Sequence, residues 1–243
     1  AGLTVLNSFG NNAGKVMAIK QGIYAERIDD GLSSIPTGTS FVNAATIRAY
    51  PGHTVTLLPT SGAQVVGIGN TSYLILQDLI FDGSNVSEEV VSLHAPGNHN
   101  RLIGSEIKNG LAQNGLTSFY SGTGGIGGFH EIINCHIHHN QIDASNSRGH
   151  GFYCGTTDNL VDGCEFNNNG PWNSTTSNHN FGLQIYSEEG QTDNCIVRNC
   201  IFHDNGAGTH GGALVVSNGD NHKIYNNLFY DNVNWTIEMF NGP

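Results

Sequence analysis

Three histidines and an arginine lie at the ends of three long loops, just before short segments that open with glycine. They are Arg148, His150, His179 and His210. A histidine can accept a proton near neutral pH, and an arginine can neutralise the carboxylate of an anionic substrate. Together, residues of these types could abstract the proton beside a uronate carboxylate and start a β-elimination.

A β-elimination also needs a group that returns a proton, and Tyr153 or Tyr186 could supply it. The histidines have a second interpretation, because imidazole rings can cap turns through hydrogen bonds, as asparagine side chains do. The sequence leaves both interpretations open.

The segment GLQIYSE, residues 182–188, is expected to be a strand that offers a surface for sugar rings. Residues two apart on a strand share a face, so Leu183 and Ile185 are expected to point inward. Gln184 and Tyr186 then point outward, where they can contact a polysaccharide. Aromatic residues are also good strand formers, so a purely structural role stays open.

Tyr153 takes the equivalent outward position in an earlier segment, and Trp172 lies in the loop before residue 182. The four residues expected to bind substrate are Tyr153, Trp172, Gln184 and Tyr186. The outward positions expected in other segments are Ser92, His94, Leu214, Val216, Glu238 and Phe240.

Carboxylates gather in one expected turn, which contains Glu188, Glu189 and Asp193, with Asp158 in the corresponding earlier turn. Carboxylate oxygens from adjacent turns could bind a hard cation, so calcium is the expected cofactor if the protein has one. The alternative is that these are solvated acids of surface turns.

The segment HIHHN, residues 136–140, resembles a zinc-binding sequence, but alternation places His136 and His138 outside and turns His139 toward the coil interior or the corner. The residues expected beside His138 in other segments do not form a set of metal ligands. They are Lys108, Asn167, His203 and Tyr230. The sequence therefore disfavours a transition-metal site here.

The elements that position these residues come from a repeat. Each copy has an aliphatic residue, a small or amide residue three positions later, and a bulky apolar residue two further on. The aliphatic positions are Leu102, Ile132, Val161, Val197 and Ile224; the small or amide positions are Ser105, Cys135, Cys164, Cys200 and Asn227; the bulky positions are Ile107, Ile137, Phe166, Phe202 and Phe229. Segment 73–83 fits the same frame through Ile75, Asp78 and Ile80.

The middle positions of the repeat are 27, 30, 29, 36 and 27 residues apart, a spacing typical of repeat architectures. A second short strand follows in each copy, and no window shows helical periodicity. Gly, at 33 residues, and about thirty Asn supply the turns. The sequence predicts an all-β protein, a single parallel β-helix domain of about eight coils over residues 1–243.

Three of the five cysteines, Cys135, Cys164 and Cys200, occupy the same slot of successive copies. Their side chains are expected to run parallel about 4.8 Å apart, which is poor geometry for a disulfide. We expect an inward column of small buried thiols, continued by Asn227, with metal binding as the alternative.

The bulk properties fit a single elongated core, since 37% of the 243 residues are hydrophobic and only 12% are charged. The net charge of −11 argues against nucleic acid and anionic membrane surfaces as partners. No apolar run reaches the length of a membrane span, and no signal peptide is recognisable. Because the chain opens at Ala1, we expect that a leader was removed from a secreted protein.

Three early segments resemble the opening coils of right-handed β-helix proteins of the pectin-lyase-like superfamily. They are KVMAIKQGIYAERI (15–28), ATIRAYPGHTVTL (45–57) and SYLILQDLIFDGSN (72–85). The resemblance covers nearly the whole chain and implies a secreted, carbohydrate-active protein, most often a lyase or glycoside hydrolase. The signatures of pectate lyases and polygalacturonases are not recognisable, so no catalytic residue is carried over.

Two function classes follow. The first is a secreted polysaccharide lyase that cleaves a uronate-containing glycan, with a glycoside hydrolase as its variant. The second is a non-catalytic solenoid such as an adhesin, spike or matrix protein. The second class is favoured by the last expected strand, Thr236–Phe240, which has no cap. Solenoids need polar caps, so the chain is expected to be a fragment or to associate end to end.

Overall fold

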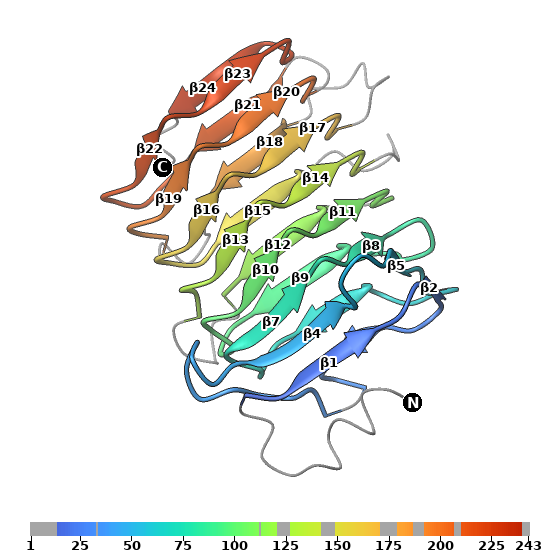
Figure 1. Ribbon diagram of the computed structural model, residues 1–243. Coiled ribbons are helices and arrows are strands. Elements are labelled where there is room, and N and C mark those ends of the chain that lie inside the picture. The colour runs from blue at the N-terminus through green and yellow to red at the C-terminus, as the bar shows by residue number, and fades with distance from the viewer. Residues whose placement is uncertain are drawn as a thin grey trace.

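The computed structural model describes residues 14–32, 34–111, 113–120, 127–141, 149–170, 179–186, 192–206 and 210–239, with His179 and His210 described by their backbone alone. Throughout these residues the chain forms strands and turns and contains no helix. The strands stack in steps as a solenoid, from the coil of β1 at one end to that of β24 at the other (Figure 1).

Three parallel sheets of eight strands run along the solenoid. Sheet A consists of β1 (Val16–Ile19), β4 (Ala45–Ala49), β7 (Leu74–Gln77), β10 (Arg101–Ile103), β13 (Glu131–Ile133), β16 (Leu160–Asp162), β19 (Ile196–Arg198) and β22 (Lys223–Tyr225). Sheet B consists of β2 (Gly22–Tyr24), β5 (Val55–Leu57), β8 (Ile80–Asp82), β11 (Glu106–Lys108), β14 (His136–His138), β17 (Glu165–Asn167), β20 (Ile201–His203) and β23 (Leu228–Tyr230). Sheet C consists of β3 (Ile28–Asp29), β6 (Val66–Ile68), β9 (Val91–His94), β12 (Leu116–Phe119), β15 (Phe152–Gly155), β18 (His179–Ile185), β21 (His210–Val216) and β24 (Trp235–Met239).

Each coil contributes one strand to each sheet in turn, so the described strands make eight coils. This confirms the parallel β-helix that the repeat predicts. Within the described part of the chain, no helix has the length and apolar character needed to cross a membrane.

The turn between sheets A and B explains the repeat. Its first residue has a positive φ in six coils, at Asp78, Gly104, Asn134, Gly163, Asn199 and Asn226. Gly, Asn and Asp adopt this left-handed conformation at the lowest cost, which is why the repeat places them there. The second residue then turns into the interior. This is the position of Cys135, Cys164 and Cys200, each at most 2% exposed.

The expected cysteine column is confirmed. The backbone N–H of Cys135 donates to Cys164 Sγ at 3.4 Å, and that of Cys200 donates to Asn227 Oδ1 at 2.9 Å. Burial, together with contacts to Cys135 and Cys200, raises the pKa of the Cys164 thiol well above its usual value. All five cysteines are free, so the column packs the core without disulfide bonds.

A ladder of buried asparagines joins the coils between sheets B and C. Asn140 Nδ2 donates to Asn169 Oδ1 at 3.0 Å, Asn169 Nδ2 donates to Asn205 Oδ1 at 2.9 Å, and Asn205 Nδ2 donates to Asn232 Oδ1 at 3.0 Å. The same amides donate to main-chain carbonyls of the preceding coil. Because buried polar groups must be paired, the ladder fixes the stacking of the turns.

Two register predictions were wrong. In segment 73–83 the residues that enter the core are Leu76, Leu79 and Phe81, one position after those predicted (Ile75, Asp78 and Ile80). In β21 all three residues are buried, but the register places Leu214 and Val216 beside the inward Leu183 and Ile185 and puts Val215 in the outward position. Both errors fall where apolar residues are consecutive, because alternation then no longer distinguishes the two faces.

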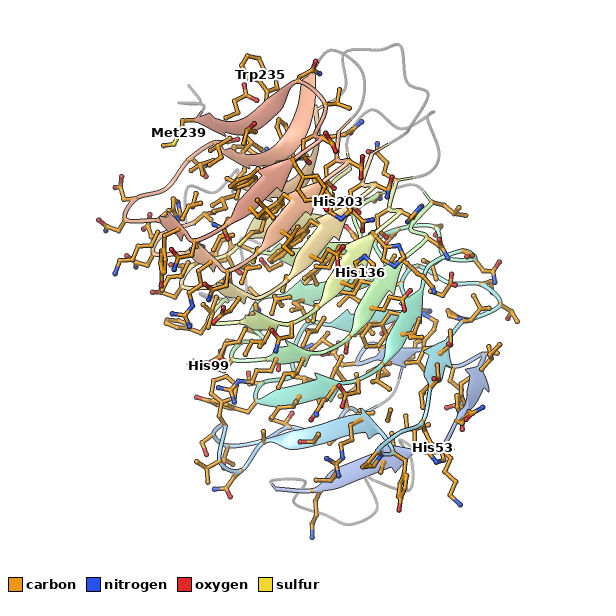
Figure 2. All side chains as sticks on the ribbon, turned by 45° about the horizontal axis from the view of Figure 1, so that its top comes forward. His53, His99, His136, His203, Trp235 and Met239 are labelled. Carbon is orange, nitrogen blue, oxygen red and sulfur yellow. The ribbon has the colours of Figure 1, made fainter. Side chains whose placement is uncertain are left out.

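The last coil, whose strand is expected to have no cap, exposes apolar side chains. Trp235 is 43%, Ile237 41% and Met239 77% exposed, and Figure 2 shows Trp235 and Met239 at the end of the solenoid. Phe240 lies outside the described residues. The structure does not contain a second chain, so end-to-end association remains a prediction.

Candidate functional site

The outer face of sheet C carries one residue per coil in a continuous register. In chain order, this row is Asp29, Gly67, Ser92, Thr117, Tyr153, Gln184, Val215 and Glu238. As predicted, Leu183 and Ile185 are fully buried while Gln184 and Tyr186 are partly exposed. Three of the four predicted substrate-binding residues therefore lie on one face.

The centre of this face is aromatic. The rings of Tyr153 and Tyr186 meet edge to face with centroids 6.3 Å apart, and the ring of His150 lies 6.0 Å from that of Tyr153. Gln184 Nε2 donates to Ser217 Oγ at 3.3 Å, which orients its amide along the sheet. The structure thus brings together His150, Tyr153, Gln184 and Tyr186.

His150 is built into a turn. It is 4% exposed, and its Nδ1 accepts the backbone N–H of Phe181 at 3.1 Å. Its own backbone N–H donates to Asn114 Oδ1 at 2.8 Å. A ring that accepts through Nδ1 carries its proton on Nε2 when neutral. The capping interpretation of His150 is therefore correct for Nδ1.

The histidines do not all share one row. His179 pairs with His210 at the start of β18 and β21, so their backbones are neighbours. His150 instead lies beside Phe181, because the Gly151 N–H donates to the Phe181 carbonyl at 3.0 Å. The remaining predicted site residues, Arg148, Trp172, Glu188 and Glu189, lie outside the described residues, as do the side chains of His179 and His210.

Of the acids in the predicted calcium site, the structure describes Asp193 and Asp158. Asp193 Oδ1 accepts the backbone N–H of Asp220 at 2.8 Å, and the Asp193 carbonyl accepts that of Asp158 at 2.8 Å. The acids therefore stack in adjacent turns, as expected. Among the described residues, no group of three or more His, Cys, Asp or Glu side chains is placed to hold a metal ion.

The HIHHN segment forms a hydrogen-bonded cluster on sheet B. His136 Nε2 contacts Asn167 Oδ1 at 2.7 Å, His138 Nε2 contacts Glu106 Oε1 at 3.0 Å, and the His138 and His139 Nδ1 atoms are 2.7 Å apart. Figure 2 shows His136 and His203 on this part of the solenoid, away from its ends. Burial and the neighbouring His136 lower the pKa of His138 to about 4, so its ring is neutral at physiological pH.

A cleft that the sequence prediction missed lies at the N-terminal end of sheet C. It has a volume of about 220 Å³ and is lined by Asp29, Asp30, Gly31, Gln64, Gly67, Ile68, Gly69, Ser92 and His94. Its floor is formed by Gly67 and Gly69, which are two residues apart in the chain. The sequence GIG, at the end of β6 and one coil after the pair Asp29-Asp30, is the signal that could have identified this depression.

The carboxylates of the cleft are held in place by main-chain donors. Asp29 Oδ1 accepts the Gly31 N–H at 2.9 Å, and Asp29 Oδ2 forms a 2.5 Å salt bridge with Arg27 Nη2. Asp30 Oδ2 accepts the N–H groups of Gly69 at 2.7 Å and Asn70 at 2.6 Å. Such hydrogen bonds fix the direction of each carboxylate.

The opposite wall has unused polar groups. Ser92 is 1% exposed, and its Oγ has no hydrogen-bond partner among the described residues. The ring of His94 lies beside that of Phe119, with centroids 5.9 Å apart, and forms no hydrogen bond within the described part of the chain. Buried polar groups are normally hydrogen-bonded, so the unpaired Ser92 hydroxyl indicates a polar group that could bind a ligand.

Comparisons with known proteins agree with this architecture. Pectate lyase Pel9A has a similar solved structure, with a TM-score of 0.53 and 13% sequence identity over 89% of this chain and 64% of that one. This chain thus corresponds to less than two thirds of the length of that enzyme. No curated protein matches the sequence significantly.

Two further solved structures align with most of the chain. One is ORF18 of Geobacillus virus E2, with 14% identity over 89% of this chain and 53% of that one, at a TM-score of 0.34. The other is the A-module of mannuronan C-5 epimerase AlgE4 from Azotobacter vinelandii, with 12% identity over 93% and 71%, at a TM-score of 0.35. At TM-scores below 0.5, neither bears on the fold.

Residues 64–242 match the family described as "Right handed beta helix region". This match covers most of the chain and extends from β6 to the last described strand, β24, so it spans the central face of sheet C. Register, core and family match together support one conclusion: the chain belongs to the right-handed β-helix family and has the pectin-lyase-like fold.

Proposed function

We propose that this protein acts on a polysaccharide that lies along the outer face of sheet C. One observation carries the proposal: adjacent coils present Phe119, Tyr153, Gln184 and Tyr186, so the face combines three aromatic rings with an amide and two phenol hydroxyls. Parallel strands are about 4.8 Å apart, which is close to the length of one sugar residue. A glycan that runs along the solenoid axis, across the strands of sheet C, would therefore place about one sugar residue over each coil.

The reaction that we propose is β-elimination of a uronate-containing glycan by a secreted lyase. A base removes the proton on the carbon next to the uronate carboxylate, the electron pair forms the C4=C5 double bond, and the C4–O bond breaks. The leaving oxygen takes a proton. His150, His179 or His210 would be the base, Arg148 would neutralise the carboxylate, and Tyr153 or Tyr186 would return the proton.

Charge sets a requirement on this reaction. The chain carries a net charge of −11, so an anionic glycan is repelled unless positive charge is present locally. We propose that Arg148 and a calcium ion at Glu188, Glu189 and Asp193 provide it. The similar fold of a pectate lyase supports a carbohydrate as substrate.

A second candidate function is non-catalytic binding of the same glycan, as in an adhesive or matrix protein. The observation that favours it is the Phe181 N–H bond to His150 Nδ1, since this ring already has a structural role. A glycoside hydrolase is the remaining variant of the enzyme proposal.

One assay separates these functions. The protein is incubated with a panel of uronate-containing and neutral polysaccharides, and both the absorbance of unsaturated products and the number of reducing ends are followed. Lyase activity raises both signals, hydrolase activity raises reducing ends alone, and pure binding raises neither. The lyase proposal is wrong if every uronate polymer in the panel stays intact with calcium present.

A further inference from the structure

We propose that the cleft at the N-terminal end of sheet C is a binding site for one uncharged sugar residue. The proposal rests on the proposed function, because it places this residue on the same glycan-binding face. The proposed lyase centre lies around Tyr153 and Gln184, in the fifth and sixth coils, whereas the cleft lies in the first three coils. The distance from Ser92 to Gln184 is three coils, about 14 Å at the usual strand spacing.

The cleft exists because two residues that line it, Gly67 and Gly69, have no side chains. Register places Gly67 between Asp29 and Ser92 on adjacent strands. A Cβ atom at Gly67 would lie 3.2 Å from Gln64 Oε1 and 3.4 Å from Asp29 Cγ. A Cβ atom at Gly69 would lie 3.7 Å from Asp30 Oδ1 and 3.9 Å from His94 Cβ. The two glycines therefore leave a cradle between a carboxylate wall and a hydroxyl–imidazole wall.

The size of the cleft limits its ligand. Its volume of about 220 Å³ is below the roughly 300–1,000 Å³ of pockets that take drug-sized molecules. A single pyranose ring is a ligand of the appropriate scale. On the next coil, outside the cleft lining, the ring of Phe119 lies beside that of His94 with centroids 5.9 Å apart, and its apolar surface can pack against the C–H face of a sugar that extends from the cleft.

The hydrogen-bonding groups match sugar hydroxyls. Asp29 and Asp30 can only accept hydrogen bonds, and their oxygens are held by N–H groups and Arg27. Ser92 Oγ and the two nitrogens of His94 can donate as well as accept, and none of them has a hydrogen-bond partner among the described residues. Each sugar hydroxyl both donates and accepts, so one ring can satisfy both walls.

Charge excludes a uronate from the cleft. Arg27 compensates the carboxylate of Asp29, but Asp30 is bound by backbone N–H groups and the Thr71 hydroxyl. The cleft therefore keeps a negative charge, and a sugar carboxylate placed there meets a like charge. The preferred ligand is a neutral hexose or pentose, so the glycan is expected to contain neutral residues as well as uronates.

Binding of matched sugar pairs tests this inference. The probes are neutral trisaccharides and their uronate counterparts of the same linkage, galactotriose against trigalacturonate and mannotriose against trimannuronate. Binding is followed by the NMR signals of the His94 ring. At least one neutral trisaccharide should bind with a dissociation constant below about 10 mM and about tenfold or more below that of its uronate counterpart.

Variants locate the binding. Gly69→Val fills the cradle, and Asp30→Asn removes the charge while keeping an acceptor for the Gly69 N–H. Both should weaken binding of the neutral sugar by about tenfold or more. Glu238→Gln is the matched control, since it removes one carboxylate from the same row at the opposite end of sheet C. It should leave binding unchanged.

Three results would overturn the inference: no neutral trisaccharide binds, the uronates bind equally well, or Gly69→Val retains full binding. Calcium binding to the cleft in place of a sugar would also overturn it. The outcome is distinguishable from that of the lyase proposal, because cleavage of uronate polymers is measured separately. Cleavage without neutral-sugar binding refutes the cleft alone, and binding without cleavage refutes the lyase alone.

Discussion

The backbone N–H of Phe181 donates to Nδ1 of His150 at 3.1 Å, across two adjacent coils at the edge of sheet C. This single bond gives His150 a structural role on the face where the sequence analysis expects it to act as a base. An alanine substitution would remove both roles at once. The two roles must therefore be separated by a side chain that keeps only one of them.

Asparagine at position 150 is such a side chain, because its carbonyl oxygen can accept the Phe181 N–H as asparagines do in the ladder of this solenoid. If His150 is the base, His150→Asn should lower the turnover of a uronate polymer by about 100-fold or more with little change in melting temperature. Unchanged turnover in a stably folded variant would show that His150 is a cap alone.

The sequence repeat predicts the parts of the fold in which the same kind of side chain recurs at the same position of each coil. The cysteine column and the stacked Phe166 and Phe202, whose ring centroids are 4.7 Å apart, follow from the repeat. The cleft was not predicted, because it depends on what Gly67 and Gly69 lack and on carboxylates from an earlier coil. Asp29 and Ser92 are 63 positions apart in the sequence, and only the register of three coils brings them to one cavity.

Burial of His130 predicts sensitivity to acid. Complete burial, and secondarily the neighbouring His99, lower the pKa of His130 to about 3. Its unfolded pKa is near 6.5, so between about pH 6.5 and pH 3 the unfolded state binds more protons than the folded state. His130 therefore makes stability fall as the pH is lowered through this window, by on the order of 5 kcal/mol in full.

His130→Asn tests this prediction. His130 lies between Asn100 and Asn159 in one column, since its Nδ1 accepts the Asn100 N–H and its own N–H donates to Asn159 Oδ1. Asparagine fits the same column and does not titrate. Denaturant unfolding from pH 7 to pH 4 should show the variant gaining stability relative to the parent as the pH falls. A constant difference across this range would contradict the account.

The asparagine ladder is expected to contribute strongly to stability. Asn169 is fully buried, accepts from Asn140, and donates to Asn205 Oδ1 and the Ile137 carbonyl. Asn169→Ala should cost about 2–4 kcal/mol, because it leaves these groups unpaired in the interior. The exposed Asn43 provides a matched control, and Asn43→Ala should change the free energy of unfolding by less than about 0.5 kcal/mol. Equal effects of the two substitutions would exclude a special role for the ladder.

Calcium at Glu188, Glu189 and Asp193 can be tested without an activity assay. Asp193→Asn removes one charge but retains an oxygen for the Asp220 N–H, so the turn should stay folded. Titration calorimetry should show calcium binding to the parent protein and binding weakened by about tenfold or more in the variant. Absence of any calcium-dependent heat in the parent protein would remove the ion from the proposed mechanism.

The location of a bound glycan is the most direct test of the central claim that sheet C is the substrate-binding face. The measurement is a crystal structure of the protein with an oligosaccharide that it binds. Sugar rings are expected along the outer face of sheet C, in contact with Tyr153, Gln184 and Tyr186. An oligosaccharide bound to the outer face of sheet A or sheet B, with sheet C empty, would contradict it.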